Sequence, residues 1–276
     1  PLNFGTLQDV FAYLNALPEK IVAVIDEYPY LKAMNDSATV DSIFQNIIDN
    51  RLVNIELILS GSHIGMMKDT LQEKNALYGR FAVTIKLNEL NYLEAAKFYP
   101  DKPPYDKAAH YAVFGGSPFV NQALQPTATI RENVISTILN PMSAVYLYAN
   151  QLLLSDYSVK INAERIFSVI GNGKKRYTEI EDKLDVKKTG NLSKQIKSLI
   201  DLEIIARNSP INKIGDNKKS TFEINDNLLR FYFTFIYKNA SALQVLGAEA
   251  FYDEYIAPAL TDFISRRFEG VCRDYF

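Results

Sequence analysis

The sequence predicts a mixed α/β fold, in which a parallel α/β unit is followed by a helical segment and a winged helix-turn-helix domain. A continuous β-branched and apolar run, 21–25, and a second mostly apolar segment, 55–59, have the composition of buried strands, and a helical pattern separates them. Prolines and glycines divide residues 91–149 into short helical stretches. Residues 161–224 have the pattern of three short helices and a polar hairpin, which is the winged-helix plan.

Composition and charge exclude several classes of protein. The chain has 276 residues, of which 47% are apolar and 22% charged, as in globular proteins and unlike disordered or fibrous ones. The net charge of −2 does not by itself point to a polyelectrolyte partner. The charge is unevenly distributed, however, since residues 160–220 hold 14 basic against 8 acidic side chains. A basic module therefore lies between two acidic flanks.

The number of cysteines and the length of the apolar runs predict the cellular compartment of the protein. One cysteine, Cys272, excludes an internal disulfide framework and suits a reducing compartment. No apolar run approaches the roughly 20 residues of a membrane helix, and no signal peptide opens the sequence. We therefore expect a cytoplasmic protein without a membrane partner. The two histidines, His63 and His110, have no metal-ligand spacing with Cys272.

The first 90 residues alternate between helical and strand patterns. Thr6 is expected to cap a helix that stops before Pro18, and strand 21–25 follows. Asp36 or Ser37 is expected to begin the next helix. Two further strands are then predicted, at 55–59 and at 82–87.

The winged-helix pattern occupies residues 161–224. Its helices are expected at 161–170, at 179–184 with Thr178 as the cap, and at 191–202. Its strands are expected at 204–207 and 220–224.

Polar side chains follow the first two predicted strands. Asp26 and Glu27 end the run that begins at Ile21, and Ser60 and Ser62 follow the next strand. In α/β folds, ligands bind at the carboxyl ends of the strands, so these side chains are candidates for chemistry. By itself the Asp-Glu pair also fits a solvated turn.

Several segments in order resemble the archaeal-type ATPase family, relatives of the AAA+ and STAND P-loop ATPases. The similar segments are IVAVIDEYPYL, LILSGSHIGMM, ALYGRF, LNELNYLEAAKFYP, FGGSPFV, IFSVIGNGKKRYTEIEDKL and FYDEYIAPALTDFISRRFEGVCRDYF. The resemblance implies ATP and Mg²⁺ as ligands. It also implies a P-loop core over 1–90, a helical lid over 91–158, a winged helix over 159–235 and a helical connector over 236–276.

The resemblance assigns roles to individual residues. Asp26 matches the Walker B aspartate, which holds Mg²⁺ through water, and Glu27 matches the adjacent catalytic glutamate. Ser60 or Ser62 matches the γ-phosphate sensor, and the sequence does not choose between them. Arg80 matches an arginine that senses phosphate or stabilises transferred charge. The alternative interpretation is that Arg80 forms an ion pair on the protein surface.

Two further features concern the nucleotide. Pro118, in a Gly-Gly-x-Pro stretch, matches a lid turn that lies against adenine, although a plain helix-breaking turn is the alternative. The sequence has no Gly-x-x-x-x-Gly-Lys-Ser/Thr loop, which in the family precedes the Walker B strand. The resemblance also implies a restriction-endonuclease-like C-terminal domain, which often completes the chain in this family. We therefore expect a chain truncated at both ends, without its phosphate loop and without this C-terminal domain, and inactive or nearly so by itself.

The alternative hypothesis is a DNA-binding winged-helix protein whose degenerate ATPase part serves as an interaction scaffold. Lys187, Lys188, Lys194 and Lys197 cluster around the start of the third helix of the basic module. Such lysines would contact phosphates without specifying a base sequence. A solvated face on a module used for packing is the plainer interpretation. The resemblance leaves oligomerisation possible.

Overall fold

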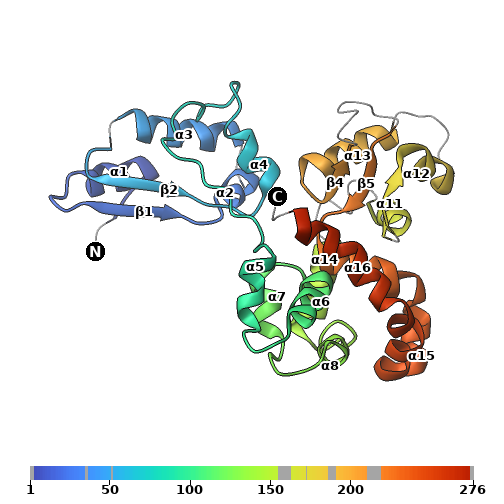
Figure 1. The fold of residues 1–276 in the computed structure, drawn as a ribbon. Helices are drawn as coiled ribbons and strands as arrows, with labels where there is room; N and C mark the ends of the chain where they lie inside the picture. The colour runs from blue at the N-terminus through green and yellow to red at the C-terminus, as the bar shows by residue number, and fades with distance from the viewer. Residues whose placement is uncertain are drawn as a thin grey trace. The chain divides into compact units, whose positions relative to one another are not determined.

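The computed structural model describes residues 3–34, 37–50, 52–154, 163–171, 173–185, 191–209 and 219–273. The fold is mixed α/β and mostly helical, with two small sheets among these residues. The chain divides into two compact units, residues 1–86 and 87–276 (Figure 1).

The first unit has the predicted strand–helix–strand order. Its elements are α1 (Leu7–Asn15), β1 (Ile21–Ile25), α2 (Tyr28–Met34), α3 (Ser37–Asp49), β2 (Ile55–Leu59) and α4 (Ile64–Asp69). Strands β1 and β2 are parallel, and their register runs from Ile21 opposite Ile55 to Ile25 opposite Leu59. The predicted cap of α1 is also confirmed, because Thr6 and Asp9 form a reciprocal capping box.

The expectation that both faces of this sheet are buried is wrong. Alternate residues of β1 lie on opposite faces, and Val22 and Val24 are 60% and 57% exposed. The opposite face packs on a core that includes Phe11 of α1 and Phe44 of α3. The sheet is thus covered by helices on one side within the described part of this unit.

The third predicted strand, 82–87, is also wrong. No strand forms there, and Val83 and Ile85 are exposed. A strand requires a hydrogen-bonded neighbour, and within the described residues β1 and β2 pair only with each other. Apolar alternation alone does not supply that neighbour.

The second unit begins with a group of short helices. They are α5 (Tyr92–Ala95), the 3₁₀ turn η1 (Ala96–Phe98), α6 (Pro104–Phe114), α7 (Pro118–Ala123), α8 (Ile130–Ser136) and α9 (Ala144–Leu154). Prolines occupy the first helical position of α6 and α7, where their missing N–H costs no hydrogen bond.

The three predicted short helices and the hairpin follow. They are α11 (Ala163–Ile170), β3 (Lys175–Arg176), α12 (Tyr177–Leu184), α13 (Asn191–Asp201), β4 (Ile205–Asn208) and β5 (Thr221–Ile224). The predicted hairpin is confirmed to within one residue, since β4 pairs antiparallel with β5. Strand β3, too short to show any periodicity, adds to the other edge of β5.

The predicted cap of the second short helix is wrong. Thr178 lies inside α12, which begins one residue earlier. Arg176 precedes the helix, and its backbone N–H donates to the carboxylate of Glu179 at 2.7 Å. Strand β3 ends at Arg176, so pairing with β5 determines where the helix begins.

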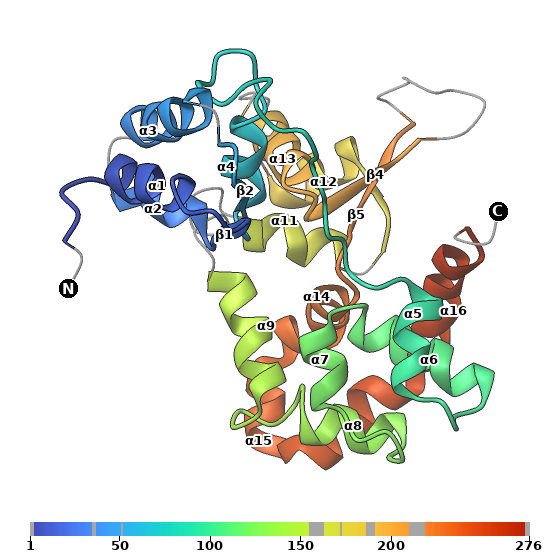
Figure 2. The ribbon, with the colours of Figure 1, turned by 90° about the vertical axis from the view of Figure 1, so that its left-hand side faces the viewer.

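The last segment of the chain is helical and ends in a long helix. It comprises α14 (Asn227–Phe231), the π-helical turn η3 (Tyr232–Ile236), the 3₁₀ turn η4 (Tyr237–Asn239), α15 (Ala240–Phe251), the π-helical turn η5 (Tyr252–Ile256) and α16 (Ala257–Arg273). Helices α14 and α16 both pack on α6 (Figures 1 and 2).

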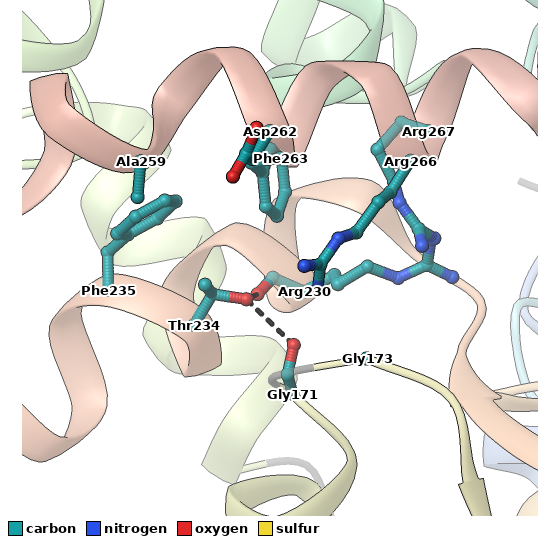
Figure 3. Close-up of a pocket in the computed structure, with 10 residues that line it drawn as sticks. All are labelled: Gly171, Gly173, Arg230, Thr234, Phe235, Ala259, Asp262, Phe263, Arg266 and Arg267. Atoms are coloured by element: carbon teal, nitrogen blue, oxygen red, sulfur yellow. Dashed lines mark hydrogen bonds between the residues drawn. The ribbon is translucent and has the colours of Figure 1, made fainter.

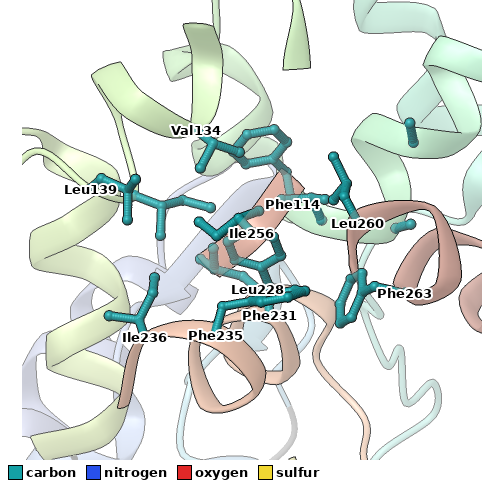
Figure 4. Close-up of a cluster of buried hydrophobic side chains, with 14 of the residues drawn as sticks. Phe114, Val134, Leu139, Leu228, Phe231, Phe235, Ile236, Ile256, Leu260 and Phe263 are labelled. Carbon is teal, nitrogen blue, oxygen red and sulfur yellow. The ribbon is translucent and has the colours of Figure 1, made fainter. Parts of the chain in front are cut away.

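The second unit has two hydrophobic cores. One lies between α11–α13 and the β3–β5–β4 sheet. The other joins Phe114 and Val134 to Phe231, Phe235 and Phe263 (Figure 4). Segments assigned from the sequence to a lid and to a connector therefore share one core. None of the described helices combines the length and the apolar character that a membrane crossing needs.

Candidate functional site

The polar residues that follow β1 and β2 lie at one edge of the sheet. Because the strands are parallel and in register, Asp26 and Ser60 come directly after the paired residues Ile25 and Leu59. The backbone continues the pairing beyond the strands, since the Ser60 N–H donates to Ile25 at 3.0 Å and the Tyr28 N–H donates to Ser60 at 2.8 Å. We name Asp26, Glu27, Ser60 and Ser62 the strand-end cluster.

Within this cluster, Asp26 contacts Ser60. The Ser60 hydroxyl donates to Asp26 Oδ1 at 2.6 Å, and the Glu27 N–H donates to the same oxygen at 3.0 Å. In the described part of the chain, the other carboxylate oxygen of Asp26 accepts no hydrogen bond, and the residue is exposed. An exposed carboxylate with one occupied oxygen is suited to hold a hydrated cation.

Glu27 contacts Ser62 instead. The backbone N–H and the hydroxyl of Ser62 both donate to Glu27 Oε2, at 3.3 and 3.2 Å. Glu27 has a φ of +51°, in the left-handed region that non-glycine residues rarely adopt. Backbone strain of this kind concentrates at functional sites, and here it accompanies two adjacent carboxylates that bind different partners.

The loop that carries both serines packs tightly on α2. A Cβ at Gly61 would lie 2.4 Å from Pro29 Cδ, so only glycine fits between Ser60 and Ser62. His63 follows, and its Nδ1 accepts the Met66 N–H at the start of α4. The two short helices therefore hold the serine loop in place.

Sequence reasoning missed a buried polar network behind the cluster. Asp41 of α3 accepts hydrogen bonds from Tyr28 at 2.6 Å, from Lys32 at 2.8 Å and from Asn75 at 2.8 Å. Burial, together with this contact to Asp41, raises the pKa of Tyr28. The one signal in the sequence was a carboxylate beside Val40 on the apolar stripe of α3.

Arg80 lies in an ion pair outside the cluster. Its Nε and Nη2 donate to the two carboxylate oxygens of Asp49, each at 2.8 Å. This contact lowers the pKa of Asp49. Asp49 ends α3, and the helix of a strand–helix–strand unit runs antiparallel to its strands, so its end lies near where the strands begin. The structure thus does not bring Arg80 to the strand-end cluster.

Pro118 lies in the second unit. It is exposed and begins α7, after Gly115 with a φ of +72° and Gly116. A Cβ at Gly116 would meet the Leu90 carbonyl oxygen at 1.9 Å, so the glycine pair permits close approach of residue 90. The close approach of residue 90 explains Gly116, and the positive φ explains Gly115.

The candidate DNA-binding residues are partly described. Lys194 and Lys197 are exposed on α13, on the face opposite the buried Leu192, Ile196 and Leu199. Lys187 and Lys188 lie outside the described residues.

No larger acidic or metal-ligating group accompanies the cluster in the described structure. Within the ranges given above, no three His, Cys, Asp or Glu side chains gather around a possible metal position. Asp26 and Glu27 are a pair, which fits a cation held through water better than one enclosed by protein ligands.

Comparison with known proteins finds one match of interest. An uncharacterized protein of Methanocaldococcus jannaschii is 29% identical over 272 residues, which cover 97% of this chain and 60% of that protein. The chain therefore spans about 60% of the length of this relative. No protein-family model matches the chain.

Proposed function

We propose that this chain is part of an archaeal-type P-loop ATPase, and that the strand-end cluster belongs to its ATP-hydrolysing site. One observation carries the proposal: two carboxylates and two hydroxyls that follow neighbouring parallel strands are hydrogen-bonded in two pairs at the edge of the sheet where α/β folds commonly bind ligands. A solvated turn would need neither the strained Glu27 backbone nor the close Gly61 contact.

Each residue of the cluster has a role in this proposal. Asp26 would hold a water of hydrated Mg²⁺ through the carboxylate oxygen that Ser60 does not occupy. When bound, Mg²⁺ neutralises charge on the phosphates. Glu27 would accept a proton from the attacking water, and Ser62 would hold its carboxylate in position. Arg80 would need to leave Asp49 to take part.

The two serines are not equivalent in this proposal. Ser60 binds Asp26, so its hydroxyl lies beside the residue expected to hold the metal. Ser62 binds Glu27, so its hydroxyl lies beside the expected base. We propose Ser62 as the residue that couples the γ-phosphate to the position of Glu27.

The test replaces Glu27 by Gln in the complete gene product that contains these residues. Turnover of Mg·ATP is expected to fall on the order of 10²-fold or more, because the amide cannot accept the proton, while ATP binding is retained. Glu56→Gln is the matched control, since Glu56 is an exposed carboxylate on the neighbouring strand β2.

Turnover unchanged by Glu27→Gln, or lowered equally by Glu56→Gln, would contradict the ATPase proposal.

A separate prediction concerns ATP binding by the 276-residue chain. Its sequence has no Gly-x-x-x-x-Gly-Lys-Ser/Thr loop, so the chain is expected to bind Mg·ATP weakly or not at all. A micromolar affinity by calorimetry would show that ATP is bound in another way.

A second candidate function is DNA binding through the basic module, which we propose to be a winged helix. It is favoured by one observation: Lys194 and Lys197 project from the exposed face of α13, away from the core of the module. A helix with this distribution can contact the phosphates of a duplex without disturbing its own packing.

Replacing both lysines by Ala tests this second function. Affinity for any duplex is expected to fall, and the slope of log affinity against log salt should flatten by about 2 units, since each lost phosphate contact contributes about 0.9. The double variant Lys97→Ala and Lys238→Ala removes the same charge from exposed sites elsewhere. A gel-shift titration without a shift at tens of micromolar protein would reject DNA as a partner.

A further inference from the structure

Three arginines gather where α14, β5 and α16 meet in the second unit. Arg230 comes from α14, whereas Arg266 and Arg267 are consecutive residues of α16. Figure 3 shows their guanidinium groups close together on the side of the hollow nearest Gly173. All three line this hollow of about 210 Å³, and all three also line a neighbouring hollow of about 320 Å³.

One buried carboxylate, Glu223, serves two of these arginines. Its Oε2 is 3.3 Å from Arg230 Nη2 and 3.2 Å from Arg267 Nη1. Asn208 donates to the other carboxylate oxygen. All three charged side chains are less than 10% exposed. Two buried guanidinium groups therefore share one carboxylate.

Arg230 has an unsatisfied donor. The residue is only 6% exposed, and its Nε is buried without a hydrogen-bond acceptor in the described structure. Its Nη2 also donates to the carbonyl of Ile224. A buried N–H without an acceptor is costly, and more so on a charged group, so an acceptor from a ligand would stabilise this arrangement.

Arg266 adds an exposed positive charge at the rim of the hollow. It is exposed, and none of the carboxylates in the described chain pairs with it. A Cβ at Gly173, which has a φ of +118°, would lie 3.7 Å from Arg266 Nη1, so the guanidinium lies over the turn after α11. Asp262 is the one carboxylate among the described residues that line the same hollow.

We propose that this hollow binds a phosphate group, held by Arg230, Arg266 and Arg267. Phosphate matches the planar donor pairs of arginine, and one of its oxygens would supply the acceptor that Arg230 Nε lacks. The hollow of about 210 Å³ is smaller than the roughly 300–1,000 Å³ typical of small-molecule sites, which favours the group alone over a whole nucleotide. This inference does not depend on the ATPase proposal.

The experiment titrates the 276-residue chain with inorganic phosphate at constant ionic strength, followed by ³¹P line broadening, with chloride as the background anion. Saturable broadening is expected. Arg266→Gln should weaken phosphate binding about 10- to 100-fold, as for one lost charged hydrogen-bonding group. Because Arg266 is exposed and has no ion-pair partner in the described chain, this variant should fold normally.

Two further variants separate binding from a merely structural role. Asp262→Asn should strengthen phosphate binding, because it removes the opposing carboxylate from the hollow. Arg131→Gln is the charge-matched control, since Arg131 is paired with Asp253 away from the hollow, and it should leave phosphate affinity unchanged.

Mg-free ATP distinguishes the two sources of phosphate. Displacement of inorganic phosphate by ATP, weakened in Arg266→Gln, would mean that the site takes the terminal phosphate of a nucleotide. Without displacement, it takes free phosphate. Absence of saturable phosphate binding in the unaltered chain, or equal affinity in Arg266→Gln and Arg131→Gln, would overturn the proposal.

Discussion

Two adjacent carboxylates, Asp26 and Glu27, differ in what they bind because of one backbone angle. With Glu27 at a φ of +51°, its N–H donates to Asp26, while its own carboxylate accepts from Ser62. In a regular strand, consecutive side chains would point to opposite faces of the sheet. The turn instead places both carboxylates at the edge of the sheet, where the neighbouring loop supplies one serine hydroxyl for each of them.

The loss of Asp41 should destabilise the first unit. Asp41→Ala removes the acceptor for Lys32, Tyr28 and Asn75 and leaves a buried ammonium group unpaired. Breaking a buried ion pair in this way costs about 3–5 kcal/mol. Hydrogen exchange of α3 and the strands, analysed by mass spectrometry, should show the free energy of opening reduced by that amount.

Asp49→Ala is the matched control for Asp41. It also removes an aspartate of α3 that is bonded to a basic side chain, but Asp49 is exposed to solvent and Arg80 is partly exposed. Its effect on exchange should be far smaller, because water and salt screen such pairs. Equal effects of the two substitutions would mean that the buried network does not stabilise the unit.

The start of α14 depends on a pair of carboxyl groups. Asp226 caps the helix, since its Oδ1 accepts the Leu229 N–H at 2.6 Å. Its side chain also hydrogen-bonds Glu89. Lost hydration and the adjacent Asp226 carboxylate raise the pKa of Glu89 to about 8. A protonated Glu89 would donate to Asp226 and so join two segments that are distant in the sequence.

This pair predicts a pH dependence of stability. The pKa of Glu89 is raised from 4.5 to about 8, so between these values the folded chain binds a proton that the unfolded chain has released. The free energy of unfolding should therefore fall as the pH rises across this interval. Glu89→Gln, which keeps a neutral donor, should remove that part of the slope in urea unfolding measured at pH 5, 6.5 and 8.

Glu254→Gln provides the comparison for Glu89. It removes an exposed carboxyl group from the same unit and should leave the pH dependence as it is in the unaltered chain. A slope that persists in Glu89→Gln would show that Glu89 is ionised in the folded chain at neutral pH.

Elements with strong local signals were predicted well, and short ones were not. The β-branched run 21–25 and the capped pattern that begins at Thr6 form the predicted strand and helix. Helix α2 and strand β3 were missed because they are too short to show a period. Pairing across β5, rather than the residues of β3, makes it a strand.

The second unit is held together by contacts that are long-range in sequence. Its larger core joins α6 and α8 to α14 and α16, so residues more than 100 positions apart share it. Arg131 and Asp253 are also more than 100 positions apart in the sequence, and they pair through two hydrogen bonds of 3.0 and 2.9 Å. The domain boundaries expected from the sequence therefore placed in different domains segments that pack against one another.

The sequence alone determined the local features of this protein: the parallel strands, the hairpin, and the order in which Asp26, Glu27, Ser60 and Ser62 follow the strands. These depend on the period of apolar residues and on capping side chains, which act over a few positions. Only the tertiary structure decided which charges meet: Lys32 with Asp41, Arg80 with Asp49, and two buried arginines with one glutamate. Such pairs depend on distance through space, which no local pattern encodes.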